Sequence, residues 1–305
     1  MLSGLRTALN AGWFEGNRMS TSALLHLHEL MAFDRQQAEI AILQRVSSAY
    51  LGNDTALVRV LGRYKLYVDT RDRGFGSHIL LDGFWEIWLT LFCARNVKRG
   101  MTAIDVGANF GYYSVLLAEL VGAKGQVVAV EPNPHAADFL RRSTELNGMI
   151  GRTRIEGLAL GKIASGDAPL YVPHNEPKNA QIVLEGFVPH IEHGRVIRVP
   201  VTTLDRLCGS CERVDFIKID AEGAEEFIFE GMNETISRHR PMIVVEFNPV
   251  RYSDPGGFLD RLAAIYGSIR RLDFSGEAVP VAREDLLSKY ASDDSLLVLS
   301  PNKPA

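Results

Sequence analysis

The sequence predicts an α/β protein with a doubly wound, mostly parallel sheet and a helical and hairpin extension at its N-terminus. Three observations support this fold. From residue 100 onward, β-branched strand segments alternate with segments of helical period, which is typical of a parallel sheet covered on both faces. A glycine-containing loop near Gly107 joins a strand to a helix, and acidic residues follow several predicted strands. Apolar residues make up 46% of the 305 residues, which is enough for a large core.

The extension is expected to cover residues 1–82. Residues 20–48 have mixed helical spacing, and residues 56–61 and 64–68 alternate as a hairpin would around Gly62. A domain over residues 83–305 is expected to follow, and its first apolar helix is predicted to begin at residues 83–88.

The core elements follow in order. Residues 101–106 predict a strand and residues 112–120 a helix, and residues 126–130 predict a second strand. Asn133 can cap a helix that has Pro134 at its first position and ends at residues 147–148. Residues 155–160 are the expected third strand.

An insertion is predicted at about residues 162–200. Residues 168–172 and 195–201 resemble two strands that flank a polar loop containing His174 and His193. Ligands of open α/β folds bind outside the carboxyl ends of the strands, and such an insertion can lie over that edge.

The loop after the first core strand favours a particular nucleotide. Gly107 and Gly111 allow a sharp turn and close approach to main-chain N–H groups. Dinucleotide folds place glycine at three positions, but here Asn109 and Tyr112 occupy the second and third, where they would crowd a diphosphate. S-adenosylmethionine (SAM) has no phosphate, and Asp105 suits its charged methionine end.

A second acid stands where the next strand ends. Glu131, followed by Pro132, is placed to accept both ribose hydroxyls, although NAD-binding proteins place an acid similarly. The sequence thus predicts SAM as the cofactor. Its predicted binding residues are Asp105, Gly107, Ala108, Asn109, Gly111, Tyr112, Glu131 and Pro132.

A second informative strand ends among charges. Lys218 lies within an apolar strand and needs a carboxylate partner, for which the hypothesis is Glu246 at the end of the next strand. Asp220 and Glu222 follow Lys218 at the edge where catalytic groups gather. Such acids can bind a hard cation, but their spacing specifies no known cage, so acid–base work is preferred and no metal is expected.

Composition limits the function classes. A net charge of −4 gives no basic excess for nucleic acid, and no apolar run approaches the ~18 residues of a membrane span. A cytoplasmic protein without membrane insertion is expected. Cys208 and Cys211 have the spacing of a zinc or redox pair, but no second pair completes four ligands, so no functional role is expected.

These motifs together resemble the FkbM-type family of SAM-dependent methyltransferases. The resemblance implies a seven-stranded, Rossmann-like class I methyltransferase sheet and methylation of a hydroxyl on a sugar, glycan or secondary metabolite. It does not cover the first eighty or so residues. The matching stretches are residues 104–114 (IDVGANFGYYS), 130–132 (VEP), 199–205 (VPVTTLD), 217–225 (IKIDAEGAE) and 240–246 (RPMIVVE).

Methyl transfer to a hydroxyl needs alignment of the acceptor and removal of its proton. Asp220 is the first candidate base and Glu222 the second, with His174 and His193 as alternatives because histidine titrates near neutrality. Two other functions stay open: a nicotinamide-dependent oxidoreductase, and a non-catalytic module that binds SAM or a glycan.

Overall fold

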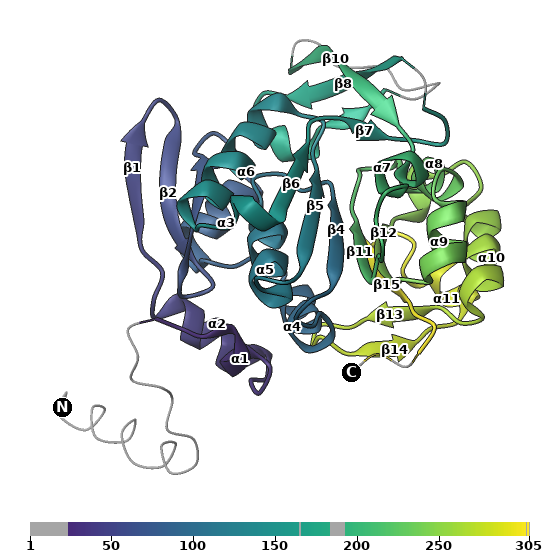
Figure 1. Cartoon of the computed structure of the whole chain (residues 1–305), viewed down its shortest axis with the longest axis horizontal. Helices are drawn as coiled ribbons and strands as arrows, with labels where there is room; N and C mark the ends of the chain where they lie inside the picture. The colour runs from purple at the N-terminus through teal and green to yellow at the C-terminus, as the bar shows by residue number, and fades with distance from the viewer. Residues whose placement is uncertain (1–23, 165, 184–192, 303, 305) are drawn as a thin grey trace, which may run out of the picture.

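The computed structural model describes residues 24–164, 166–183, 193–302 and 304 (Figure 1). Its centre is an eight-stranded sheet with the strand order β14-β13-β15-β12-β11-β4-β5-β6. The strands are β4 (Thr102–Val106), β5 (Gln126–Val130), β6 (Thr153–Glu156), β11 (Phe216–Ile219), β12 (Met242–Phe247), β13 (Arg270–Leu272), β14 (Ala278–Pro280) and β15 (Ser295–Leu299).

Most of this sheet is parallel, as predicted. Strands β6, β5, β4, β11 and β12 pair in parallel, whereas β15 runs antiparallel to both β12 and β13. The sheet has one strand more than the expected seven, because β14 pairs with β13 at the edge. The parallel strands end together, so the loops that follow them share one edge of the sheet.

Helices cover both faces of the sheet, and alternate strand residues divide between two apolar clusters. On β4, Ala103 packs with α4, α5 and α6, while Ile104 packs on the opposite face with α7 to α11. The helices are α4 (Ile87–Asn96), α5 (Tyr112–Val121), α6 (Pro134–Leu146), α7 (Leu204–Cys208), α8 (Glu225–Glu230), α9 (Asn233–His239), α10 (Pro255–Tyr266) and α11 (Arg283–Leu287), with the short 3₁₀ turns η1 (Ile150–Arg152) and η3 (Pro249–Arg251). In the described part of the chain, no helix combines the length and the apolar character that crossing a membrane requires.

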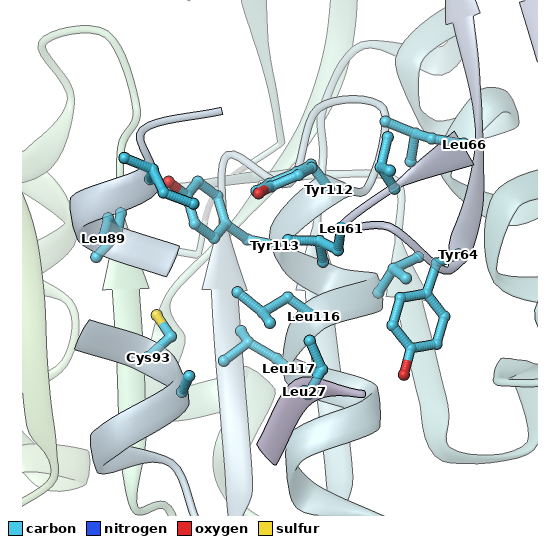
Figure 2. Packing of buried hydrophobic residues seen from close by; sticks show 14 of the residues in the cluster. Leu27, Leu61, Tyr64, Leu66, Leu89, Cys93, Tyr112, Tyr113, Leu116 and Leu117 are labelled. Atoms are coloured by element: carbon cyan, nitrogen blue, oxygen red, sulfur yellow. The ribbon is translucent and has the colours of Figure 1, made fainter. Parts of the chain in front are cut away.

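The N-terminal part packs on this core. The predicted hairpin is confirmed, and Leu61 and Gly62 form its turn with positive φ angles of 53° and 64°. Figure 2 shows Leu61 and Leu66 in the same buried cluster as Leu116 and Leu117 of α5. The elements are α1 (Leu27–Leu30), α2 (Arg35–Leu43), β1 (Ser48–Gly52), β2 (Thr55–Val60), β3 (Tyr64–Asp69) and α3 (Phe75–Asp82).

The helix expected from residues 83–88 begins later. Gly83 ends α3 with a φ of 73°, and α4 starts only at Ile87. Residues 84–86 therefore form a short connection, because a left-handed glycine terminates the preceding helix.

The insertion forms a second, four-stranded sheet with the order β7-β10-β8-β9. Its two predicted strands are confirmed as β8 and β10, which pair antiparallel. The strand expected over residues 155–160 is split, because β6 ends in the main sheet and β7 pairs with β10. Residues 165 and 184–192 of the insertion lie outside the described residues. The elements are β7 (Ala159–Leu160), β8 (Asp167–Pro173), η2 (Pro177–Asn179), β9 (Gln181–Ile182) and β10 (Gly194–Thr202).

Candidate functional site

A cavity of about 370 Å³ lies where the parallel strands end, between the loops of the main sheet and the insertion. This volume is in the range of small-molecule sites. The loops after the strands contribute Gly107, Asn109, Glu131 and Asp220, and the end of β12 contributes Glu246. Leu170 of β8 and Ile182 of β9 form another wall. Phe75, Trp85 and Glu86 contribute from the segments before the first core strand.

Gly107 is required by the packing of two strand-end loops. Its φ is 74°, and a Cβ placed there would lie 1.8 Å from the carbonyl oxygen of Asp220. The loop after β4 thus lies directly against the loop after β11. The sequence predicted a glycine for close ligand approach, and the structure adds this backbone contact as a second reason for it.

Glu131 connects the loops after β4 and β5. The main-chain N–H groups of Asn109 and Asn133 each donate to one oxygen of its carboxylate, both at 2.8 Å. Burial nevertheless raises the pKa of Glu131 to about 7, against the lowering effect of these donors. Glu131 lines the cavity, and each of its carboxylate oxygens can accept a further hydrogen bond.

Asn109 has a buried acceptor without a donor. Its φ is 51°, in the left-handed region that asparagine tolerates. Its side-chain Oδ1 is buried and has no hydrogen-bond partner among the residues that the structure describes. A buried polar atom without a partner is costly, so a ligand donor in the cavity would fit here.

Lys218 is not paired with Glu246, so that hypothesis was wrong. Its Nζ lies 3.6 Å from Asp105 and 3.3 Å from Asp220, and it donates to the carbonyl oxygen of Gly107 at 3.3 Å. The register explains this choice, because Lys218 stands directly opposite Asp105 on β4. Burial alone lowers the pKa of Lys218, but the charges of Asp220, Asp105 and Glu86 outweigh it and raise the pKa above its usual value.

Glu246 belongs to a second charged group. Arg251, in the turn after β12, pairs with Glu246, with Glu222 at 3.3 Å and with Asp294 at 3.2 Å. Burial and the charge of Asp220 raise the pKa of Glu222 to about 7 and that of Glu246 to about 10. One guanidinium thus faces three carboxylates at the cavity wall.

The structure brings several of the predicted site residues together. Of the predicted set, those lining the cavity are Gly107, Asn109, Glu131, Pro132, Asp220 and Glu222. Asp105 lies beneath the cavity: it is fully buried, and it accepts a hydrogen bond from the Ser114 hydroxyl at 2.6 Å. Gly111 begins α5 with a φ of 94°, and Ala108 packs against Leu140 in a small apolar cluster.

Tyr112 does not crowd the loop as predicted. Its side chain is buried in the core, where its hydroxyl lies 2.9 Å from that of Thr90 on α4. Of the two side chains expected to obstruct a diphosphate, only Asn109 lines the cavity. The cause is local, since the tyrosine falls on the inner face of α5.

The two histidines lie elsewhere. His174 and His193 are exposed and joined through their backbones, with His174 N–H donating to the His193 carbonyl at 2.8 Å, and neither lines the cavity.

Cys208 is buried, which raises its thiol pKa to about 12, and no disulfide joins it to Cys211. Within the described ranges, no group of three or more His, Cys, Asp or Glu residues is arranged to hold a metal ion.

Sequence reasoning missed Glu86. This residue lines the cavity from the connection before α4, with its Oε2 accepting a hydrogen bond from the Tyr113 hydroxyl at 3.1 Å. Burial and the charge of Asp220 raise its pKa to about 7. An acid between Trp85 and Ile87 in an otherwise apolar run was the available signal.

A sequence profile described as the methyltransferase FkbM domain matches residues 105–275, which is more than half of the chain. The chain belongs to this family. The matched segment includes the loop after β4, Glu131 and the charged residues that follow β11 and β12.

Individual relatives of this FkbM-domain protein match only part of its chain, at low sequence identity. A protein-L-isoaspartate O-methyltransferase of Aeropyrum pernix is 34% identical over 112 residues, which are 35% of this chain and 41% of that protein. Methyltransferase sdnD of Sordaria araneosa is 26% identical over 46% of this chain and 63% of that protein. The chain thus spans about half the length of these relatives. The crystal structure of methyltransferase FkbM from Methylobacillus flagellatus covers 65% of this chain and 43% of that chain, at 20% identity and a TM-score of 0.41.

Proposed function

We propose that this protein is a SAM-dependent O-methyltransferase that acts on a hydroxyl of a sugar, glycan or secondary metabolite. The carrying observation is the cavity at the strand ends, where Glu131 offers acceptors to the ribose hydroxyls and the unpartnered Oδ1 of Asn109 offers an acceptor to the methionine end. Membership of the FkbM family supports the same reading.

The charge of the cavity supports a cationic cofactor. Its two cationic lining residues are Lys178 and Arg251, whereas its carboxylates are Glu86, Glu131, Asp220, Glu222, Glu246 and Asp294. SAM carries a sulfonium and an ammonium against one carboxylate, so its net charge is positive. NAD carries a diphosphate, for which the cavity offers little positive charge, because Arg251 is already paired with three carboxylates.

The proposed cofactor contacts follow from the positions of the loops. Glu131 would accept from the ribose hydroxyls, and Gly107 and Asn109 would hold the methionine end. When bound, SAM would supply a methyl carbon that an oxygen nucleophile attacks in line with the C–S bond, and S-adenosylhomocysteine would leave as a neutral thioether. The residues of the chain then have to orient the acceptor and take its proton.

Asp220 is the proposed proton acceptor. It lines the cavity, and the Lys218 ammonium lies 3.3 Å from its carboxylate and fixes the position of this group. Glu222 is the second candidate, because a pKa of about 7 suits proton transfer near neutrality, but it is engaged by Arg251. His174 and His193 are exposed and do not line the cavity, so they rank below both acids.

Calorimetric titration with SAM, S-adenosylhomocysteine and NAD tests the cofactor. Binding of the first two is expected, and binding of NAD alone would overturn the proposal.

Transfer of labelled methyl from SAM to a panel of sugars and hydroxylated metabolites then tests the activity. Asp220→Asn should bind SAM but lose most turnover, whereas Asp167→Asn, an exposed change on β8, should retain it. Binding of SAM without transfer to any acceptor would favour a non-catalytic module.

A further inference from the structure

Glu86 is held in an unfavourable backbone conformation at the cavity wall. Its φ of 38° and ψ of 67° are left-handed, a region that residues with a Cβ seldom adopt. Two contacts fix this connection: the Thr90 N–H donates to the Glu86 carbonyl at 3.1 Å, and the Thr90 hydroxyl donates to the Trp85 carbonyl at 3.2 Å. Strained residues of this kind concentrate at functional sites.

The carboxylate of Glu86 has one engaged and one available oxygen. Oε2 accepts from the Tyr113 hydroxyl at 3.1 Å, and no donor reaches Oε1 from the described residues. The side chain lines the cavity, so Oε1 is open to a ligand. The Nζ of Lys218 lies 5.2 Å from the centre of the Tyr113 ring, so the same tyrosine contacts the Glu86 carboxylate and the Lys218 ammonium.

Glu86 forms no ion pair with a cation of the described residues. Lys218 is the buried cation near Glu86, and it is already shared by Asp105 and Asp220. Lys178 faces the region from the insertion, but it stacks over Trp85 at 5.6 Å and forms no ion pair with a described carboxylate. Burial and repulsion from Asp220 raise the pKa of Glu86 to about 7, although the charges of Lys218 and Lys178 act in the opposite direction.

We propose that Oε1 of Glu86 accepts a hydrogen bond from the α-ammonium group of the methionine end of SAM. This inference rests on the proposed function, since it requires that SAM occupies the cavity. Asp105, the acid predicted for this role from the sequence, is separated from the cavity and neutralised by Lys218. Glu86 lies before the segment that matches the family profile, and it brings the missing acid to the cavity from the N-terminal side.

The test compares two ligands on one variant. S-adenosylhomocysteine carries the α-ammonium, whereas 5′-methylthioadenosine lacks the whole amino-acid end. For Glu86→Gln, the Kd of S-adenosylhomocysteine should rise about tenfold or more, as expected for loss of a charged hydrogen bond. The Kd of 5′-methylthioadenosine should stay within about twofold of the wild-type value.

Two further variants separate binding from structure. Tyr113→Phe removes the donor to Oε2 but keeps the carboxylate, so it should weaken S-adenosylhomocysteine binding less than Glu86→Gln does. Glu145→Gln, an exposed change on α6, should alter neither Kd. Equal effects of Glu86→Gln on both ligands, or none on either, would overturn the inference. A wild-type protein that binds neither ligand would instead contradict the proposed function.

Discussion

Lys218 on β11 faces Asp105 on β4 across the centre of the sheet, with Nζ and Oδ1 3.6 Å apart and both side chains almost completely buried. The pair lies directly beneath the cavity, where Lys218 also reaches Asp220 and the carbonyl of Gly107. A buried charge pair costs desolvation, so its value lies in fixing the relative positions of the two strand ends that carry the site.

Removing the cation of this pair should destabilise the fold strongly. Lys218→Met leaves Asp105 buried without a counter-charge, so we expect the free energy of unfolding to fall by about 3–5 kcal/mol. Urea denaturation measures this change. Lys162→Met, which breaks an exposed pair with Glu230, should cost less than about 1 kcal/mol. The double variant Asp105→Asn/Lys218→Met should be more stable than Lys218→Met, and a further loss would contradict the pairing.

Gly107 should tolerate no side chain. Alanine there combines a positive φ with a Cβ 1.8 Å from the Asp220 carbonyl oxygen, so we expect a loss of roughly 3 kcal/mol or more in unfolding free energy. Binding of S-adenosylhomocysteine should weaken as well, because the two loops are forced apart. Gly148→Ala is the matched control, since its φ is 67° but its Cβ would meet open space, and it should cost about 1–2 kcal/mol. Similar losses for both variants would exclude the loop contact as the cause.

The stability of the ligand-free protein should respond to pH through Glu131. Its pKa is raised to about 7 in the folded state from an ordinary 4.5, so the folded state binds the proton more tightly. Its contribution to stability therefore falls as pH rises from about 4.5 to 7. The free energy of unfolding of Glu131→Gln, measured relative to that of the wild type, should therefore rise by up to about 3 kcal/mol between pH 5 and pH 8. Urea denaturation of both proteins at the two pH values measures this change. If the two unfolding free energies differ by the same amount at both pH values, the raised pKa of Glu131 is refuted.

The two histidines of the insertion should not be needed for methyl transfer. His174 and His193 are exposed and lie outside the cavity, so His174→Ala and His193→Ala should each keep kcat/KM within about twofold of the wild type. Steady-state kinetics on the acceptor found in the screen provides the comparison. A loss of tenfold or more in either variant, with unchanged SAM binding, would restore that histidine as a candidate base.

Much of the fold was predictable because its signals are local. The strand that ends before Gly107 and the acid that ends β5, Glu131, follow from apolar runs closed by turn residues. The cap and proline at the start of α6 likewise fixed its first turn, where the Asn133 side chain accepts from the His135 N–H. These signals placed Gly107 and Glu131 at the edge of the sheet where the cavity lies.

The charge partners were not predictable, since they depend on register and on loop paths. Lys218 meets Asp105 only because β11 and β4 pair in one register, which no local pattern records. Glu246 meets Arg251 because the chain turns back after β12. Glu86 lines the cavity because it adopts a left-handed backbone conformation. The apolar spacing of its neighbours had instead predicted that it begins a helix.

The buried cluster that joins β2 and β3 to α4 and α5 bears on how this protein can be divided. Leu66 and Val68 of β3 are fully buried in the same cluster as Leu89 of α4 and Leu116 of α5. A fragment expressed from residue 83 onward would expose that apolar face to water and invite aggregation. Chimeras between family members should therefore exchange the three-stranded sheet β1-β2-β3 together with the helices α4 and α5 that it covers.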